Sequence, residues 1–479
     1  MKDQLSQTVK PDASFGYFAV FFVAALGVSL SLLAAYEPVL TLALCLAGGL
    51  AVLFLKSPCL ALNVVLFMGG IPLEALGGHD LDSGQKPLLR FSGGTTVDGI
   101  CLVTLCFVMT FLLLSSGPVR VPERFRPYVF FLGFLGFSLV YSGARLEGLR
   151  LLFKLAYPVL IFLVTSRSVK TPREVTSAVG CWVAGGIVAT LLGGLTYLFR
   201  GPAAFITSED FRYSSGLLHQ SPFSMYMFAL FALCYSIWRT RGARGYAALA
   251  LLFGLQAMIA ETRITWAAVA VSLLIFESTM GKGRRIVRAA GLAGGMVTIL
   301  LYMVWHSTGL QYRFFSMQFD PQSSAGELIQ NLNVSGRNFV WAGVYENFLS
   351  HSLWFGQGVG SSGAFLAAYL PDQAVPHNEY LRVLHDGGVI GTVLFLTGLV
   401  GLFGLLRSLL VNCIAVEQRM FVRLSLMLFF GYLVMAMTDN PFDYYLVFTQ
   451  YVFFAMAVAN MTAWDEGARR VKSVVIPQP

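Results

Sequence analysis

Charged residues are scarce in this sequence. Asp, Glu, Lys and Arg make up 12% of the 479 residues, whereas 56% are hydrophobic and the mean hydropathy is +0.69. A chain with so small a polar share lacks the surface that a soluble domain needs to remain in water. The composition therefore excludes a water-soluble protein and predicts an integral membrane protein.

Cysteine is also scarce, and its placement argues against disulfides. The seven cysteines are Cys45, Cys59, Cys101, Cys106, Cys181, Cys234 and Cys413. All but the last fall inside apolar runs, and Cys413 falls on the side that we assign to the cytoplasm below. We therefore expect free thiols that behave as small hydrophobic side chains.

Signatures of metal and nucleotide chemistry are missing as well. The sequence has no HExxH motif, and His377 and His385 are too far apart along a helix to share one ion without a bend. No Gly-Lys-Ser/Thr follows the glycines near 356–363, so these glycines predict either an anion-binding nest or a flexible turn, and not an ATP site. A metal site is the weaker use of the histidines.

Long apolar runs are abundant. Runs of about 17 to 25 residues cross a bilayer as helices, because a helix satisfies its own backbone hydrogen bonds there. We predict an all-α, polytopic protein with about 12–14 transmembrane helices. The predicted spans lie near 16–35, 39–55, 58–72, 99–115, 127–142, 148–166, 175–198, 221–238, 245–260, 264–279, 287–305, 388–406, 420–438 and 444–463.

Basic residues outside the spans set the orientation. Most fall on one side of this topology, from Lys2 and Lys10 to Arg469, Arg470 and Lys472. The positive-inside rule makes that side cytoplasmic and places both termini there, with the N-terminal run as an uncleaved anchor. The net charge of +8 is then a topology signal, and no nucleic-acid partner is needed to explain it.

One outer segment is much longer than an ordinary loop, which predicts a folded periplasmic subdomain. We divide the chain into an N-terminal transmembrane bundle (1–305), this periplasmic loop (306–387), C-terminal transmembrane helices (388–464) and a cytoplasmic tail (465–479). The loop and the other outer segments hold all six histidines and several arginines, whose placement against the topology bias points to function.

The outer segments also carry a series of short motifs. In chain order these are Arg212 with Gly216 and Pro222, then Glu261-Thr262-Arg263, then Ser335-Gly336-Arg337 with Trp341, then Gly356-x-Gly358-x-Gly360, then His377-Asn378 with Gly388 and Gly391.

From about 205 to 400, these motifs resemble the O-antigen ligase and polysaccharide polymerase (Wzy-like) superfamily of bacterial inner-membrane glycosyltransferases. The resemblance implies a GT-C-like helical fold and an inverting, metal-independent glycosyltransferase without a cofactor. It also implies an undecaprenyl-diphosphate-linked oligosaccharide donor, a glycan or lipid-linked acceptor, and an active site at the periplasmic face of the bacterial inner membrane.

The chemistry of such a transfer matches the outer residues. Displacement of a diphosphate needs a base for the incoming hydroxyl and positive charge for the leaving group. We assign the base to His377, because an imidazole titrates near pH ~6.5. The alternative is a histidine that only caps a helix.

Arginine supplies the positive charge in this interpretation. Arg212, Arg263 and Arg337 are predicted to grip diphosphate oxygens with their planar donor forks. Contact with lipid headgroups is the alternative for each arginine. Secondary candidates are Arg150, Lys154, Asn378 and Asp386, and we rank Asp439 and Asp443 below them.

Other functions stay open at this point. A polymerase extends a lipid-linked glycan, whereas a ligase transfers it to the lipid A core. We favour the polymerase, because the predicted spans exceed the roughly twelve expected of a ligase. A lipid-linked oligosaccharide flippase is the alternative from another class, but its charges would line a cavity between two similar halves. A chain-length co-polymerase is a candidate partner of the polymerase.

Overall fold

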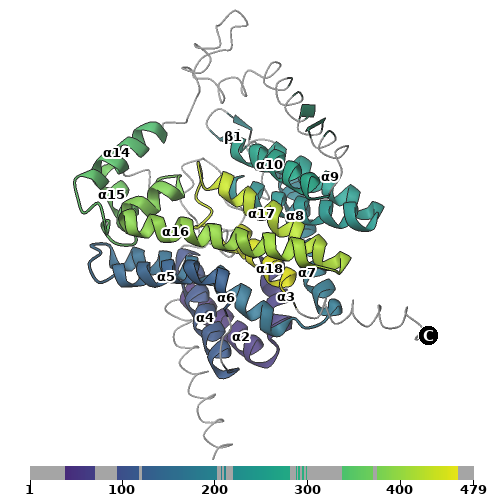
Figure 1. Cartoon of the computed structure of the whole chain (residues 1–479), viewed down its shortest axis with the longest axis horizontal. Helices are drawn as coiled ribbons and strands as arrows, with labels where there is room; N and C mark the ends of the chain where they lie inside the picture. The colour runs from purple at the N-terminus through teal and green to yellow at the C-terminus, as the bar shows by residue number, and fades with distance from the viewer. Residues whose placement is uncertain are drawn as a thin grey trace, which may run out of the picture.

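The computed structural model describes residues 38–70, 94–117, 121–201, 206–207, 210–211, 220–260, 262–280, isolated positions between 287 and 302, 337–370 and 375–461. This part of the chain is almost entirely helical (Figure 1). Its small sheet pairs β1 (Ile206–Thr207) with antiparallel β2 (Asp210–Phe211). The all-α prediction is confirmed for the described residues.

Most of the helices follow the predicted apolar runs, whereas those at 337–349 and 361–369 fall in the segment predicted as a periplasmic loop. In chain order they are α2 (Pro38–Lys56), α3 (Pro58–Met68), α4 (Gly94–Ser115), the 3₁₀ turn η2 (Glu123–Phe125), α5 (Arg126–Ser138), α6 (Arg145–Ser168), α7 (Pro172–Arg200), α8 (Gln220–Arg241), α9 (Arg244–Ile259), α10 (Arg263–Thr279), α14 (Arg337–Leu349), α15 (Ser361–Tyr369), α16 (Glu379–Asn412), α17 (Val416–Met435), the π-helical turn η4 (Tyr445–Thr449) and α18 (Gln450–Ala459).

Several of these helices can cross a membrane. In the described part of the chain, five are long and apolar enough: α6, α7 over Pro172–Phe199, α8, α16 and α17. This confirms the polytopic membrane class. The predicted span 16–35 and most of 287–305 lie outside the described residues, so the total number of spans stays a prediction.

The core is centred on α8 and α18. Helix α18 is buried along its whole length, as a helix that is apolar on all sides must be. Trp182 of α7 stacks on Tyr451 of α18 with ring centroids 4.3 Å apart. Small residues bring α3 and α7 into backbone contact, since a Cβ on Gly70 would lie 2.4 Å from the Gly185 carbonyl oxygen.

Contacts along the helices show which ends lie together. Helices α16 and α5 are antiparallel, because Gly391 faces Phe134 whereas Gly401 faces the Arg124 carbonyl. Helices α10 and α17 are antiparallel too, since Ser272 Oγ donates to Met427 O and Arg423 donates to Thr279 O. The first residues of α10 and α16 and the turn after α17 therefore share one end of the bundle, which we call the His377 end.

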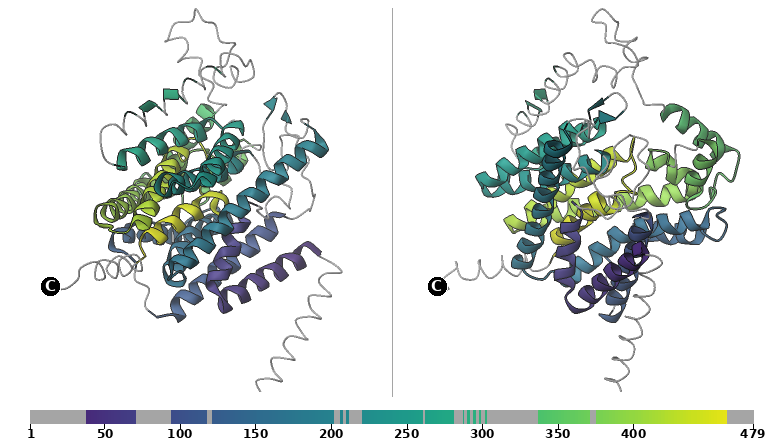
Figure 2. Two further views of the ribbon diagram at one scale, coloured as in Figure 1. Left: turned by 90° about the vertical axis from the view of Figure 1, so that its right-hand side faces the viewer. Right: turned by 180° about the vertical axis from the view of Figure 1, so that it is seen from behind.

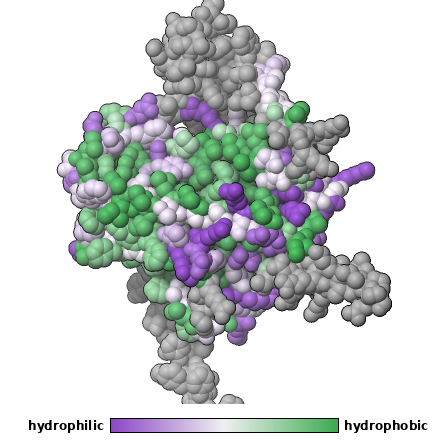
Figure 3. Space-filling view, in the orientation of Figure 1, coloured by the Kyte–Doolittle hydropathy of each residue, from purple (hydrophilic) through white to green (hydrophobic). Residues whose placement is uncertain are grey.

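Helices α14 and α15 also lie at the His377 end, beside the first turns of α16 (Figures 1 and 2). Hydrophobic residues dominate the surface over the neighbouring parts of α5 and α16 (Figure 3). Helix α16 runs through the boundary that we placed at 387/388, but its backbone is broken at Gly388, where φ is +62°.

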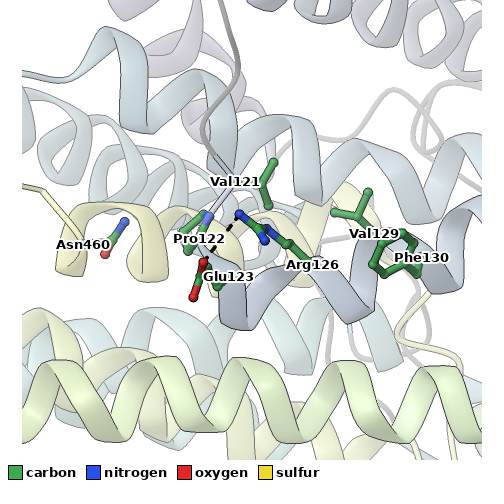
Figure 4. A pocket seen from close by; sticks show the side chains of 7 residues that line it. All are labelled: Val121, Pro122, Glu123, Arg126, Val129, Phe130 and Asn460. Carbon is green, nitrogen blue, oxygen red and sulfur yellow. Dashed lines mark ion pairs between the residues drawn. The ribbon is translucent and has the colours of Figure 1, made fainter.

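The opposite end of the bundle carries much of the basic charge and is called the basic end here. It includes Arg124, which donates to Gly404 O, and Arg239, which lies 2.8 Å from the Glu277 carboxylate. A pocket at this end is lined by Val121, Pro122, Glu123, Arg126, Val129, Phe130 and Asn460 (Figure 4). Because it adjoins the far end of α16, this pocket is not part of a site around His377.

Candidate active site at the His377 end

His377 occupies a strained turn. Its φ of +51° makes it the one non-glycine residue with positive φ in the described part of the chain. The turn is fixed on both sides, since Trp341 Nε1 donates to Pro376 O at 2.8 Å and the Asn378 side chain caps α16 by accepting from Leu381 N at 3.0 Å. Strain of this kind persists only where surrounding contacts impose it, and it is concentrated at functional sites.

The imidazole of His377 meets the turn that follows α17. Its Nδ1 lies 2.9 Å from Asn440 Nδ2 and 3.8 Å from Asp439 Oδ1. The His377 side chain is 28% exposed, whereas that of Asp439 is 3% exposed. One edge of the ring therefore faces a buried amide and carboxylate, and the side chain remains accessible from outside.

Asp439 is held in its charged form. Burial by itself raises the pKa of this carboxyl, but the contact with His377, the Asn440 backbone N–H and the positive charge of Arg337 together bring the pKa below its ordinary value. Arg337 therefore lies close enough to act on Asp439 electrostatically. The structure thus brings Arg337, His377 and Asp439 into one neighbourhood.

Arg263 lies at the same end of the bundle, as the first residue of α10. The start of α10 is tied to α8 by hydroxyl contacts, with Ser224 Oγ 2.9 Å from Thr265 Oγ1 and 2.6 Å from Thr262 Oγ1. The third predicted arginine, Arg212, lies outside the described residues.

A second group of charged side chains, partly or fully buried, lies beside the His377 turn. Asp443 accepts from Lys154 Nζ at 2.7 Å and from Arg382 Nη1 at 2.8 Å, and Glu379 lies 3.5 Å from the same Arg382 nitrogen. Burial raises the pKa of Asp443, but the two cations bring it well below the ordinary range. These four side chains thus form one network that joins α6, α16 and the turn after α17.

The secondary candidates Lys154, Arg150 and Asn378 have different surroundings in the structure. Lys154 pairs with the partly buried Asp443, whereas Arg150 pairs at 2.6 Å with Glu147 on the exposed surface of α6. Asn378 is the cap of α16 and adjoins His377.

Asp386 is buried within the protein. Its carboxylate accepts from Gly360 N and Ser362 N, both at 2.8 Å, at the start of α15. The nest formed by the glycine-rich segment is therefore filled by a carboxylate of the chain itself. The adjacent His385 is fully buried and lies 2.8 Å from Asn347 Oδ1, which ties α14 to α16.

The sequence analysis assigned no role in the site to Asn440, Glu379 or Arg382. The contact between His377 and Asn440 joins residues 63 positions apart, so no local spacing predicts it. In the part of the chain that the structure describes, no three His, Cys, Asp or Glu side chains gather in a way that could hold a metal ion.

The fold and this site define a polytopic helical membrane protein with a histidine, a carboxylate and arginines at one end of the helix bundle. Residues 247–396 match the family model described as O-Antigen ligase. The match covers about a third of the chain, and over those residues it confirms the predicted resemblance to the O-antigen ligase and polysaccharide polymerase superfamily. No curated protein matches the chain.

Proposed function

We propose that this protein transfers a glycan from an undecaprenyl-diphosphate carrier to a sugar hydroxyl at the periplasmic face of the bacterial inner membrane. The observation that carries the proposal is the strained His377 turn, with Nδ1 directed at Asp439 and Asn440 and with Arg337 near by. The match to the O-Antigen ligase family supports the reaction class.

The reaction is an inverting displacement at the anomeric carbon. The acceptor oxygen forms a bond to that carbon while the bond to the diphosphate oxygen breaks, and the electron pair leaves with undecaprenyl diphosphate. The acceptor proton passes to His377. Arg337, Arg263 and Arg212 stabilise the charge that develops on the leaving group, so no divalent cation is required.

Proton transfer to Nε2 of His377 requires the ring proton to sit on Nδ1. Asp439 favours that tautomer, because its carboxylate repels a lone pair on Nδ1. Asn440 Oδ1 is buried without a hydrogen-bond partner, and a half-turn of the amide would let it accept from Nδ1–H. Asp439 and Asn440 then orient the base, and the charge of Asp439 stabilises the imidazolium that forms.

The acceptor distinguishes two members of this reaction class. We favour a polymerase that passes the glycan to another lipid-linked repeat, with transfer to the lipid A core as the alternative. The experiment mixes purified protein in proteoliposomes, in excess EDTA, with a lipid-linked oligosaccharide and each acceptor. We expect release of undecaprenyl diphosphate and longer lipid-linked products.

Each other outcome of this experiment has a definite meaning. Products formed only on lipid A core would replace the polymerase with the ligase. Movement of the intact donor across the bilayer without diphosphate release would overturn the enzyme and favour the flippase. Activity that EDTA abolishes and one metal restores would overturn the arginine-based mechanism.

A further inference from the structure

Residues 353–358 lie beside the break in α16. Around Gly388 the helix cannot form its own hydrogen bonds, and four backbone groups are released. Residues 353–358 pair with all four. Val389 N donates to Leu353 O at 2.9 Å, Ile390 N to Trp354 O at 3.1 Å, Gln357 N to His385 O at 3.0 Å and Gly358 N to Asp386 O at 2.9 Å.

This pairing satisfies the backbone groups that the break in α16 leaves without helical partners. Within a bilayer, a broken helix is tolerated only where other protein groups satisfy the freed N–H and C=O groups. The approach is so close that a Cβ on Gly388 would lie 2.4 Å from Gly356 N. The depth of segment 353–358 is therefore fixed by the depth of residue 388 in α16.

Residue 388 lies where the lipid-facing surface of α16 begins. Val389, Val393, Leu396 and Val400 are all exposed and follow helical spacing along one face, with Val400 70% exposed. In a membrane protein, such a stripe faces lipid. Through its bonds to residues 389 and 390, the loop around Trp354 lies at the head of this stripe.

The side chains of the loop suit that position. Leu353, Trp354 and Phe355 are consecutive and exposed, and Trp354 is 65% exposed. The hydroxyl of Tyr141, in the turn that follows α5, donates to Phe355 O at 2.9 Å, and Val140 beside it is 67% exposed. Exposed apolar side chains thus continue from both helices onto the loop.

We propose that Leu353, Trp354 and Phe355 form an anchor that inserts into the interfacial zone of the bilayer, where phospholipid headgroups meet acyl chains. Tryptophan is enriched at this depth, because its ring is apolar and its N–H is polar. The anchor holds α14 and α15, and with them Arg337 and the His377 turn, against the membrane surface. This inference does not depend on the proposed reaction.

The test places the full-length protein in lipid nanodiscs that contain phosphatidylcholine brominated either near the headgroup or near the acyl-chain end. Bromine quenches tryptophan fluorescence at short range. We expect Trp354→Phe to reduce the quenched fraction of the emission, and to do so more strongly with the shallow bromine than with the deep one.

Two further variants keep this test interpretable. Trp182 is fully buried in the core, so Trp182→Phe removes unquenched emission and should raise the quenched fraction. Adding Leu353→Trp to the Trp354→Phe variant should restore shallow quenching. The proposal is overturned if Trp354→Phe leaves lipid quenching unchanged, or if Trp354 is instead quenched by aqueous iodide. Cross-links between two copies at Trp354 without lipid quenching would also overturn it and identify a dimer contact.

Discussion

At the scale of single residues, the chemistry depends on how His377 and Asp439 meet. Replacing His377 with Ala should lower the transfer rate by about 10² to 10⁴, the usual effect of losing a general base, and leave donor binding intact.

Asp439→Asn keeps the shape but removes the charge that stabilises the imidazolium, so the rate should fall by at least about tenfold, or about 1.4 kcal/mol. Rates and donor binding of purified variants measure both effects.

A matched control exists for the histidine. His351 is exposed, and its ring contacts the nearby Asn347 O and Ser350 Oγ. His351→Ala should therefore transfer glycan at the normal rate. Normal turnover in His377→Ala would remove this residue from the base role.

The role of the three arginines is tested by substitution with lysine, which keeps the positive charge but lacks the planar guanidinium group. Lysine cannot make the two-point contact with diphosphate oxygens that arginine makes. We expect at least two of Arg212→Lys, Arg263→Lys and Arg337→Lys to lose most of their transfer activity in the proteoliposome assay. If all three remain fully active, bidentate contact at these positions plays no part in the reaction.

The lowered pKa of Asp443 predicts that the stability of the fold decreases in acid. Its pKa is lower in the folded protein than in the unfolded chain, so it stabilises the fold above the ordinary Asp range, and this contribution is lost as the pH falls through the folded value. Thermal unfolding in detergent should therefore occur at lower temperature below about pH 4.

The matched variant for that dependence is Asp443→Asn, which leaves Lys154 and Arg382 without their shared anion. At neutral pH it should be less stable by about 3 kcal/mol, the lower end of the cost of breaking a buried ion pair, because Arg382 is 8% exposed. It should also depend less on pH in the acid range. An acid dependence identical to that of the unchanged protein would mean that other carboxyls are responsible.

At the scale of elements, α16 shows what a local pattern predicts and what it misses. The sequence predicts a short histidine helix and a membrane span, and both are present. It does not predict that they form one helix with a break at Gly388, because the break is stabilised by backbone groups that lie about thirty residues upstream. The glycines near 356–363 left two interpretations open, and the carboxylate that fills their nest is found only in the folded chain.

The break itself can be tested. Gly388 has a φ of +62° and no room for a Cβ, so Gly388→Ala should lower the thermal stability by about 2 kcal/mol or more. Gly133 in α5 is the control, since among the described residues no atom beyond its own stretch of helix lies within 4 Å of an added Cβ. Gly133→Ala should be neutral, or stabilising by about 0.5 to 1 kcal/mol. Equal effects of the two substitutions would contradict a specific role for the break.

At the scale of the whole molecule, the two ends of the bundle should face opposite sides of the membrane. We expect a cysteine at His351 to react with a membrane-impermeant thiol reagent from the periplasm. A cysteine at Glu123, beside the basic end, should react only after the membrane is opened. Both are placed in a variant whose seven native cysteines have been replaced. The reverse labelling pattern would invert the topology on which the proposed site rests.

The sequence by itself determined the membrane class, the run of helices and the family resemblance. Apolar runs of span length leave a chain few alternatives in a bilayer, and the motifs around Arg263, Arg337 and His377 are local in sequence. Only the tertiary structure decided which groups meet. The contacts of His377 with Asn440, of Lys154 with Asp443 and of Trp354 with Ile390 join distant segments. They form because helix packing brings those segments to one end of the bundle, and no local periodicity encodes that.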